Sequence, residues 1–168
     1  MIIKLIYTLF IGVLFAALIG FGIAAFYLTP KEPEYPIDLK IARPEEKVNE
    51  AIFYQLKTQQ EKYDQEMKVY TGKMGTYNRN VALIAIIASI ITLVVSLTLF
   101  RKILLIADGL LLGGVLTLGY SIIRSITTGD DKFRFIIVTI GFVIALVLGY
   151  VKFIKERPEA SRSGQGKK

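Results

Sequence analysis

Residues 81–100 read VALIAIIASIITLVVSLTLF, an unbroken apolar run that decides the fold of this chain. A helix needs roughly 20 mostly apolar residues to cross the hydrocarbon core of a bilayer. Further apolar runs cover residues 5–28, 103–123 and 135–151. The last run is slightly short, but Lys152 can direct its ammonium group to the interface, so that the helix extends to Ile154. The sequence therefore predicts an all-α fold, a bundle of four transmembrane helices.

The composition agrees with this prediction and limits the chemistry of the chain. Hydrophobic residues make up 53% of the sequence, which is typical of a membrane protein. The chain contains neither Cys nor His. Their absence excludes disulfides, thiolate nucleophiles, the usual zinc and haem ligands and the commonest general base. No recognisable catalytic or cofactor motif is present, so we expect no enzyme activity, no cofactor, no metal and no nucleic-acid partner.

The first apolar run resembles a signal peptide only at its start, where Lys4 precedes apolar residues. The apolar core of a signal peptide has about 7–15 residues and ends at a cleavage site with small residues. This run is longer, and Phe26 and Tyr27 stand where cleavage would be expected. We therefore predict that it is retained as the first span.

The distribution of charge predicts the orientation. One side of the membrane receives both termini, the Arg101-Lys102 pair and the basic tail at residues 155–168. The other side receives residues 29–80, in which acidic and basic residues balance. Because cytoplasmic loops carry an excess of Lys and Arg, we expect a plasma (inner) membrane protein with both termini in the cytoplasm. The tail either serves this topology alone or also binds anionic lipid of the bilayer.

The segment between the first two spans has two parts. Prolines at positions 30, 33 and 36 follow the three-residue repeat of a polyproline II helix, so residues 29–43 are predicted as an extended linker. Within it, residues 37–41 alternate like a short strand or extended chain. Pro44 then suits the first position of a helix, which is predicted over residues 44–79.

An apolar and aromatic stripe runs along this predicted helix at heptad spacing and continues into the second span. Helix and span together would form a rod of about 80 Å at 1.5 Å per residue. Gly72 and Gly75 each cost about 1 kcal/mol relative to Ala, which predicts a hinge within residues 71–76. The stripe either contacts a partner or another copy, or it packs against its own chain or rests at the membrane interface. Its members are Phe53, Leu56, Tyr63, Met67, Tyr70, Met74 and Tyr77.

Small residues recur four positions apart in the spans. In lipid, helices associate where small side chains let their backbones approach closely. The pattern predicts a compact bundle or tight contacts with neighbouring subunits. The packing residues are Gly12, Ala16, Gly20, Ala24, Gly109, Gly113, Gly141, Ala145 and Gly149, with Ala88, Thr92 and Ser96 in the second span. Most hydroxyl groups of the spans are expected to bond the preceding turn of their own helix.

Asp108 is the one charged residue within the four apolar runs. An acid inside a span is a candidate ion or proton site. The alternative is structural, because Asp108 lies close enough to Arg101-Lys102 to pair with either residue near the interface. Asp-Gly is also a turn dipeptide. The hairpin between the second and third spans is therefore expected either at Arg101-Lys102 or at Asp108-Gly109.

These features favour a non-enzymatic membrane protein that acts by assembly, as a homo-oligomer or as a structural or accessory subunit of a larger membrane complex. The alternative is an oligomeric channel or small transporter with its pore between subunits, because several large-pore channels share the four-span topology. The predicted organisation is residues 1–28 (first span), 29–43 (linker), 44–79 (external helix), 80–154 (remaining spans) and 155–168 (basic tail).

Overall fold

The computed structural model describes residues 2–37, 50–98 and 103–155. Its helices are α1 (Ile2–Phe26), α3 (Glu50–Thr98), α4 (Leu104–Ile126) and α5 (Asp131–Gly149), and a π-helical turn, η1 (Tyr150–Lys155), continues α5. In this part of the chain four helices are long and apolar enough to cross a membrane, and there is no strand. The predicted all-α fold with four spans is confirmed.

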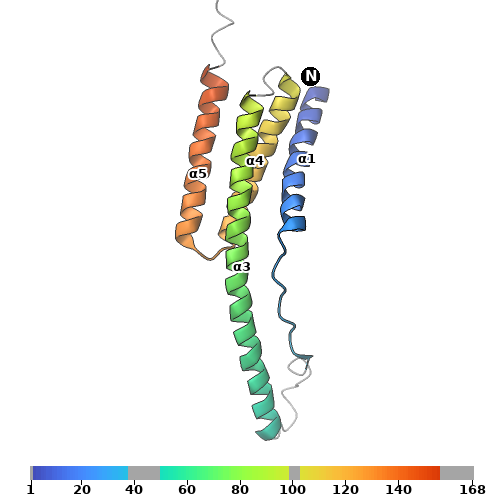
Figure 1. Ribbon diagram of the computed structural model, residues 1–168, viewed down its shortest axis with the longest axis vertical. Coiled ribbons are helices and arrows are strands. Elements are labelled where there is room, and N and C mark those ends of the chain that lie inside the picture. Colours follow the sequence, from blue (N-terminus) through green and yellow to red (C-terminus); the bar gives the residue numbers. More distant parts are fainter. Residues whose placement is uncertain (1, 38–49, 99–102, 156–168) are drawn as a thin grey trace, which may run out of the picture.

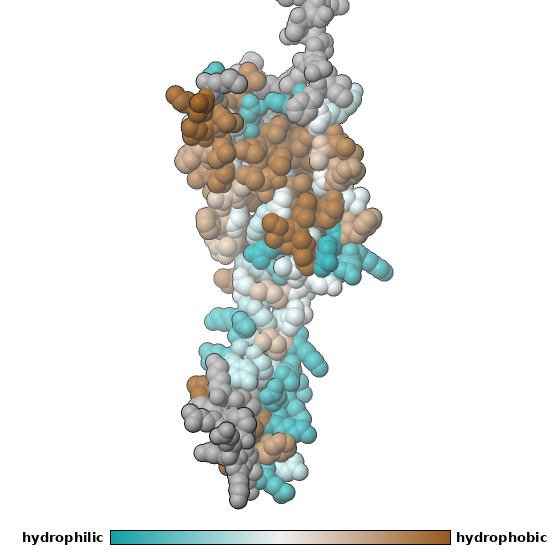
Figure 2. Space-filling view, turned by 180° about the vertical axis from the view of Figure 1, so that it is seen from behind, coloured by the Kyte–Doolittle hydropathy of each residue, from teal (hydrophilic) through white to brown (hydrophobic). Residues whose placement is uncertain are grey.

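Helix α4 lies at the centre of the bundle and packs against α3 and α1 along its length, with α5 on its other side (Figure 1). At one end of the bundle, here the terminal end, α1 begins and α5 ends. At the opposite end, α3 continues well beyond the other helices. Figure 2 shows apolar side chains over the bundle and mostly polar ones over this extension, as a membrane boundary between them requires.

Serines join α3 to α4. Ser89 donates to the carbonyl of Gly114, Ser96 to that of Ala107, and Ser121 to that of Ala82, with oxygen–oxygen distances of 2.7, 2.6 and 2.8 Å. Each step of seven residues along α3 matches a step of seven back along α4, so the two helices keep one antiparallel register. The acceptors are glycine or alanine, which allow a hydroxyl to reach the neighbouring backbone.

These serines differ from the expectation that hydroxyl groups in the spans bond their own helix. The threonines follow it: Thr92, Thr98, Thr117 and Thr139 each donate to the carbonyl four residues earlier. Burial alone does not decide the partner, because Thr117 and Ser125 are as fully buried as these three serines and bond their own helix. Ser89, Ser96 and Ser121 instead donate across the close contact between α3 and α4, where a carbonyl of the facing helix lies within reach.

Glycines bring α1 against α4. A Cβ atom on Gly113 would lie 3.1 Å from the carbonyl oxygen of Gly12 and 3.1 Å from the Cβ of Phe15. A Cβ on Gly109 would lie 2.7 Å from a methyl group of Ile11. Because an ordinary contact of this kind measures 3.4 Å or more, both positions need glycine for the helices to approach this closely.

Helix α3 has no break, so the hinge predicted within residues 71–76 is wrong. The hydroxyl groups of Thr71 and Thr76 bond to carbonyls of the preceding turn. Gly75 lies beside the backbone of the α4–α5 loop, where a Cβ would stand 3.0 Å from the carbonyl oxygen of Thr128. This glycine therefore allows a close contact and does not bend the helix.

The loop between α4 and α5 explains where α4 ends and where α5 begins. Gly129 has a φ of 73°, which glycine adopts without a steric penalty. Asp130 then caps α5, and its carboxylate accepts hydrogen bonds from the backbone amides of Lys132 and Phe133. At the terminal end, α4 begins at Leu104, so Asp108-Gly109 is inside a helix and forms no hairpin.

Several predicted features lie outside the described residues. These are the start of the external helix at Pro44, most of the alternating segment 37–41, the Arg101-Lys102 pair and the tail after position 155.

Candidate functional site

Polar and aromatic side chains gather where the apolar runs end on the side of the α3 extension. Arg124 directly follows the run of α4, Asn78 and Asn80 precede that of α3, and Tyr27 lies next to the end of α1. With Tyr77 and Tyr120 they form what we call the boundary cluster. Tyrosines are enriched at this depth because the ring is apolar and the hydroxyl is polar.

Arg124 is the centre of this cluster. Its Nε donates to the hydroxyl of Tyr120 and its Nη1 to Oδ1 of Asn78, both at 3.0 Å. The guanidinium carbon lies 5.4 Å from the ring centre of Tyr120 and 5.9 Å from that of Tyr77, which is cation–π distance. Both hydrogen-bond acceptors are neutral, so the half-buried charge is held without a carboxylate.

The cluster also joins α1 to α3. The rings of Tyr27 and Tyr77 stack with centres 5.1 Å apart and planes 11° from parallel. The side-chain amide of Asn80 donates to the hydroxyl of Tyr27 at 2.7 Å, and Thr29 donates to the hydroxyl of Tyr77 at 3.1 Å. The chain therefore leaves α1 in a direction set by α3.

Residues 27–36, here the strap, run antiparallel beside the α3 extension (Figure 1). The strap begins at Tyr77 of α3 and reaches Tyr63, whose ring meets that of Tyr35 edge to face at 5.0 Å. From Tyr63 to Tyr77, α3 rises about 21 Å. Eight residues of polyproline II span about 25 Å, so the strap must be nearly fully extended, as its prolines predict.

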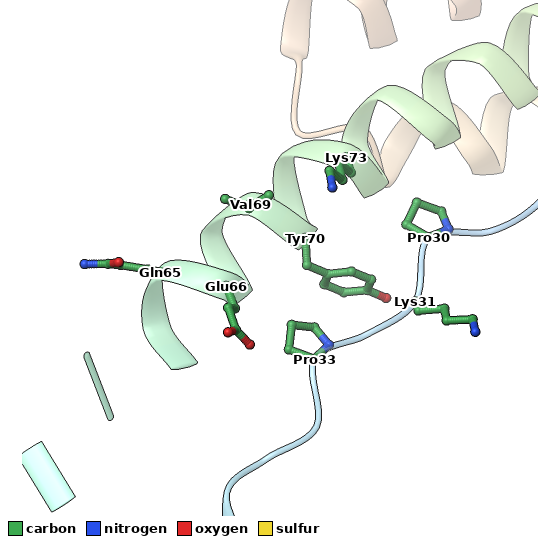
Figure 3. A pocket seen from close by; sticks show the side chains of 8 residues that line it. All are labelled: Pro30, Lys31, Pro33, Gln65, Glu66, Val69, Tyr70 and Lys73. Carbon is green, nitrogen blue, oxygen red and sulfur yellow. The ribbon is translucent and has the colours of Figure 1, made fainter. Parts of the chain in front are cut away.

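The strap and α3 enclose an open groove of about 600 Å³. Figure 3 shows Tyr70 pointing toward the strap between Pro30 and Pro33. Three residues of polyproline II advance about 9 Å and seven helical residues advance about 10 Å, so proline and tyrosine repeats nearly match. Tyr63, Tyr70 and Tyr77 thus face their own chain, which was the second interpretation of the stripe.

The other members of the stripe lie as follows: Leu56, Met67 and Met74 are half-buried, and Phe53 is exposed. Next to Phe53, near the described start of α3, Ile52 and Tyr54 are also exposed, by 50% and 66%. These three residues, here the tip, are large apolar side chains that project into solvent at the far end of the extension.

Asp108 pairs with Lys152 of η1, and the carboxylate oxygen lies 2.8 Å from Nζ. The pair lies at the terminal end and lines a cavity of about 50 Å³ between α3, α4 and η1. A cavity needs about 10–15 Å³ to hold one water, so this one has room for a few. Both side chains are about one-third exposed or more, so the pair is not sealed within the bundle.

The predicted packing residues fall into two groups. Gly12, Gly109, Gly113 and Gly141 contact a neighbouring helix closely enough for a Cβ to meet side chains or backbone. Gly20 and Gly149 have open space around them, Ala24 and Ala145 are exposed, and Ala16 is half-buried. Gly114 is not among the predicted packing residues, yet it packs against Leu93. Ala107, Gly114 and Ser121 are seven residues apart, and this spacing of small residues could have predicted the contact of α4 with α3.

No group of three metal-ligating side chains occurs among the residues that the structure describes. No protein-family model matches this chain, and the comparisons with curated proteins and with solved structures found no match either.

Proposed function

We propose that this protein is a non-enzymatic subunit of a membrane assembly, in which the bundle anchors a rod that binds further copies of the chain. The observation that carries the proposal is the continuity of α3. Gly75 is level with the α4–α5 loop, and Glu50 lies 25 residues farther along the helix. At 1.5 Å per residue the helix extends about 38 Å beyond the bundle.

The rod has a second support in the strap. Contacts at Tyr63, Tyr70 and Tyr77 hold the extended strap along much of the rod, and the cluster at Tyr27 fixes its origin. A braced helix of this kind suits a protein that holds a surface at a set distance from the membrane. The grooves described along this helix are open, so a substrate would not be surrounded in them.

The tip is the surface that we assign to the contact between copies. Ile52, Phe53 and Tyr54 are 50–66% exposed, and adjacent exposed apolar side chains favour association. Acidic and basic residues balance over positions 29–80, although the whole chain carries a net charge of +7. The net positive charge therefore comes from residues outside this segment, and it does not make the rods repel one another.

The test uses the full chain in mild detergent. Light scattering and chemical cross-linking should detect an oligomer, and the Phe53→Ser/Tyr54→Ser double variant should reduce it. Val69→Ser is the matched control, because Val69 is 57% exposed on the same helix but away from the tip, and it should leave the oligomer intact. A wild-type protein that stays monomeric at all concentrations contradicts self-assembly, and a co-purifying complex would indicate a larger assembly.

We propose in addition that the termini are cytoplasmic and that the rod lies outside the plasma membrane, in agreement with the excess of Lys and Arg near the termini. The chain has no Cys, so single cysteines can report on each side. Thr58→Cys should react with a membrane-impermeant maleimide in intact cells, and Ser163→Cys only after permeabilisation. The reverse pattern contradicts this orientation.

An oligomeric channel or transporter is the second proposal, favoured by the cavity of about 50 Å³ at Asp108 and Lys152, which is large enough for water. The buried serines bond across α3 and α4, so a conducting path would lie between copies. Reconstituted protein should then conduct ions, and Asp108→Asn should change the conductance or its pH dependence. A bilayer that stays silent at high protein content rejects this proposal and leaves the first one standing.

A further inference from the structure

Arg124 carries a charge that its surroundings do not neutralise. Among the described residues, ion pairs join Arg134 to Asp131 and Lys152 to Asp108, and none includes Arg124. Asp130, the other acid of the nearby loop, caps α5 through backbone amides. A guanidinium is therefore held half-buried between tyrosines and an amide oxygen with no anion of its own.

The free donors of Arg124 indicate what would neutralise it. A guanidinium has five N–H donors, and two of them bond to Tyr120 and Asn78. Nη2 makes no hydrogen bond within the described part of the chain and is not completely buried, and Arg124 as a whole is half-buried. Nη2 therefore keeps donors that a ligand could use. A partly desolvated cation is stabilised most by an anion that accepts these remaining donors.

The position of Arg124 at the end of the apolar run indicates which kind of anion would lie beside it in a bilayer. Arg124 directly follows the apolar run of α4, and its contact with Asn78, together with the contacts of Tyr27 with Tyr77 and Asn80, puts the ends of the neighbouring apolar runs at the same level. In a bilayer this level holds the phosphates of the lipid headgroups. Arginine binds phosphate through two parallel N–H bonds, and here Tyr120 and Asn78 fix the guanidinium in advance.

We propose that Arg124, oriented by Asn78 and Tyr120, binds a phosphate group, and that its source is an anionic phospholipid headgroup. This site lies at the opposite end of the bundle from η1 and does not depend on the assembly of the rods. The headgroup phosphate would complete the boundary cluster and hold the α1, α3 and α4 ends together at the membrane surface.

The experiment measures lipid retention by the full chain in detergent, with native mass spectrometry as the readout. Phosphatidylglycerol and phosphatidylcholine are titrated separately. Arg124→Gln should weaken phosphatidylglycerol binding about tenfold or more, because it removes a charge-assisted hydrogen bond. Arg79→Gln is the matched control, since Arg79 is an exposed arginine beside Asn78 and its loss changes the net charge equally. It should leave the affinity within about twofold.

Two further variants keep the outcome decisive if Arg124→Gln does not fold. Arg124→Lys keeps the charge but loses the paired N–H geometry, and Tyr120→Phe removes one of the groups that orient the guanidinium. Both should weaken binding by an intermediate factor. Equal lipid retention by wild type and all three variants overturns the proposal, as does an equally large loss in Arg79→Gln.

A separate arm identifies the source of the phosphate. Inorganic phosphate is added to the lipid-free protein, and the thermal midpoint is compared with that in phosphatidylglycerol. Stabilisation by the lipid alone supports a headgroup site. Stabilisation by inorganic phosphate that is lost in Arg124→Gln supports the same phosphate chemistry with a soluble source. No stabilisation by either, with wild-type and Arg124→Gln midpoints equal throughout, overturns it.

Discussion

The contact between α1 and α4 gives the sharpest test of the bundle. Gly113 faces the backbone of α1, and a Cβ at this position would stand 3.1 Å from the carbonyl oxygen of Gly12 and from Phe15. The backbone oxygen cannot turn away as a side chain can. Gly119 lies in the same helix, but a Cβ there would meet nothing within 4 Å. Gly113→Ala and Gly119→Ala therefore make the same chemical change in different surroundings.

The expected difference follows from two opposing contributions. Replacing glycine by alanine in a helix gains about 1 kcal/mol of propensity at either position. Overpacking at a close contact costs about 1–3 kcal/mol, and only Gly113→Ala incurs it. The free energy of unfolding of Gly113→Ala should therefore lie about 1–3 kcal/mol below that of Gly119→Ala. Adding Phe15→Ala should recover only a small part of this loss, because it removes the contact with the ring carbon Cδ1 but leaves those with the Cβ of residue 15 and the Gly12 carbonyl.

Reversible unfolding in mixed micelles with increasing dodecyl sulfate measures these differences, with circular dichroism as the readout. The comparison between the two alanine variants cancels the propensity contribution. If they unfold at the same detergent fraction, α1 does not dock on α4 in this register, and the assignment of Gly109 and Gly113 to close packing is wrong.

Three further outcomes are expected. Gly114→Ala should lower stability because its Cβ would lie 2.7 Å from the side-chain end of Leu93, and Leu93→Ala should restore much of it; no rescue in unfolding experiments would contradict this contact. Tyr70→Ala should release the strap and speed tryptic cleavage after Lys31 several-fold, whereas a substitution at the tip should leave the cleavage rate unchanged. Asp108→Asn should reduce the free energy of unfolding by no more than about 1 kcal/mol, because its ion pair is partly exposed; a larger loss in the same assay would indicate a pair shielded from water.

The four spans were predictable because the requirement behind them is local. A run of apolar residues long enough for the hydrocarbon core identifies a span without knowledge of its neighbours. The long rod was predictable in part, since the heptad stripe continues from Tyr77 into the second span. The hinge prediction failed because each glycine costs only about 1 kcal/mol, and the contact of Gly75 with the α4–α5 loop favours an unbroken helix.

The polar clusters could not be predicted from spacing. Arg124 and Asn78 are 46 residues apart, and Lys152 and Asp108 are 44 apart. Which residues meet depends on the antiparallel register of the helices, which the sequence pattern alone does not specify. A serine such as Ser89 can bond its own turn or a neighbour, and the choice depends on the distance between helices. Sequence patterns identified Asp108 as a candidate site but left its partner open.

The match between strap and rod has a consequence for how this protein could change its length. The two segments run side by side but differ in their rise per residue, which is about 3.1 Å in the strap and 1.5 Å in the helix. A rod longer by one heptad keeps its tyrosines in register with the strap only if the strap gains three residues. Variation in the height of the rod should therefore occur as paired insertions of seven and three residues, before Tyr77 and after Tyr27. An insertion in one segment alone would put the two repeats out of phase.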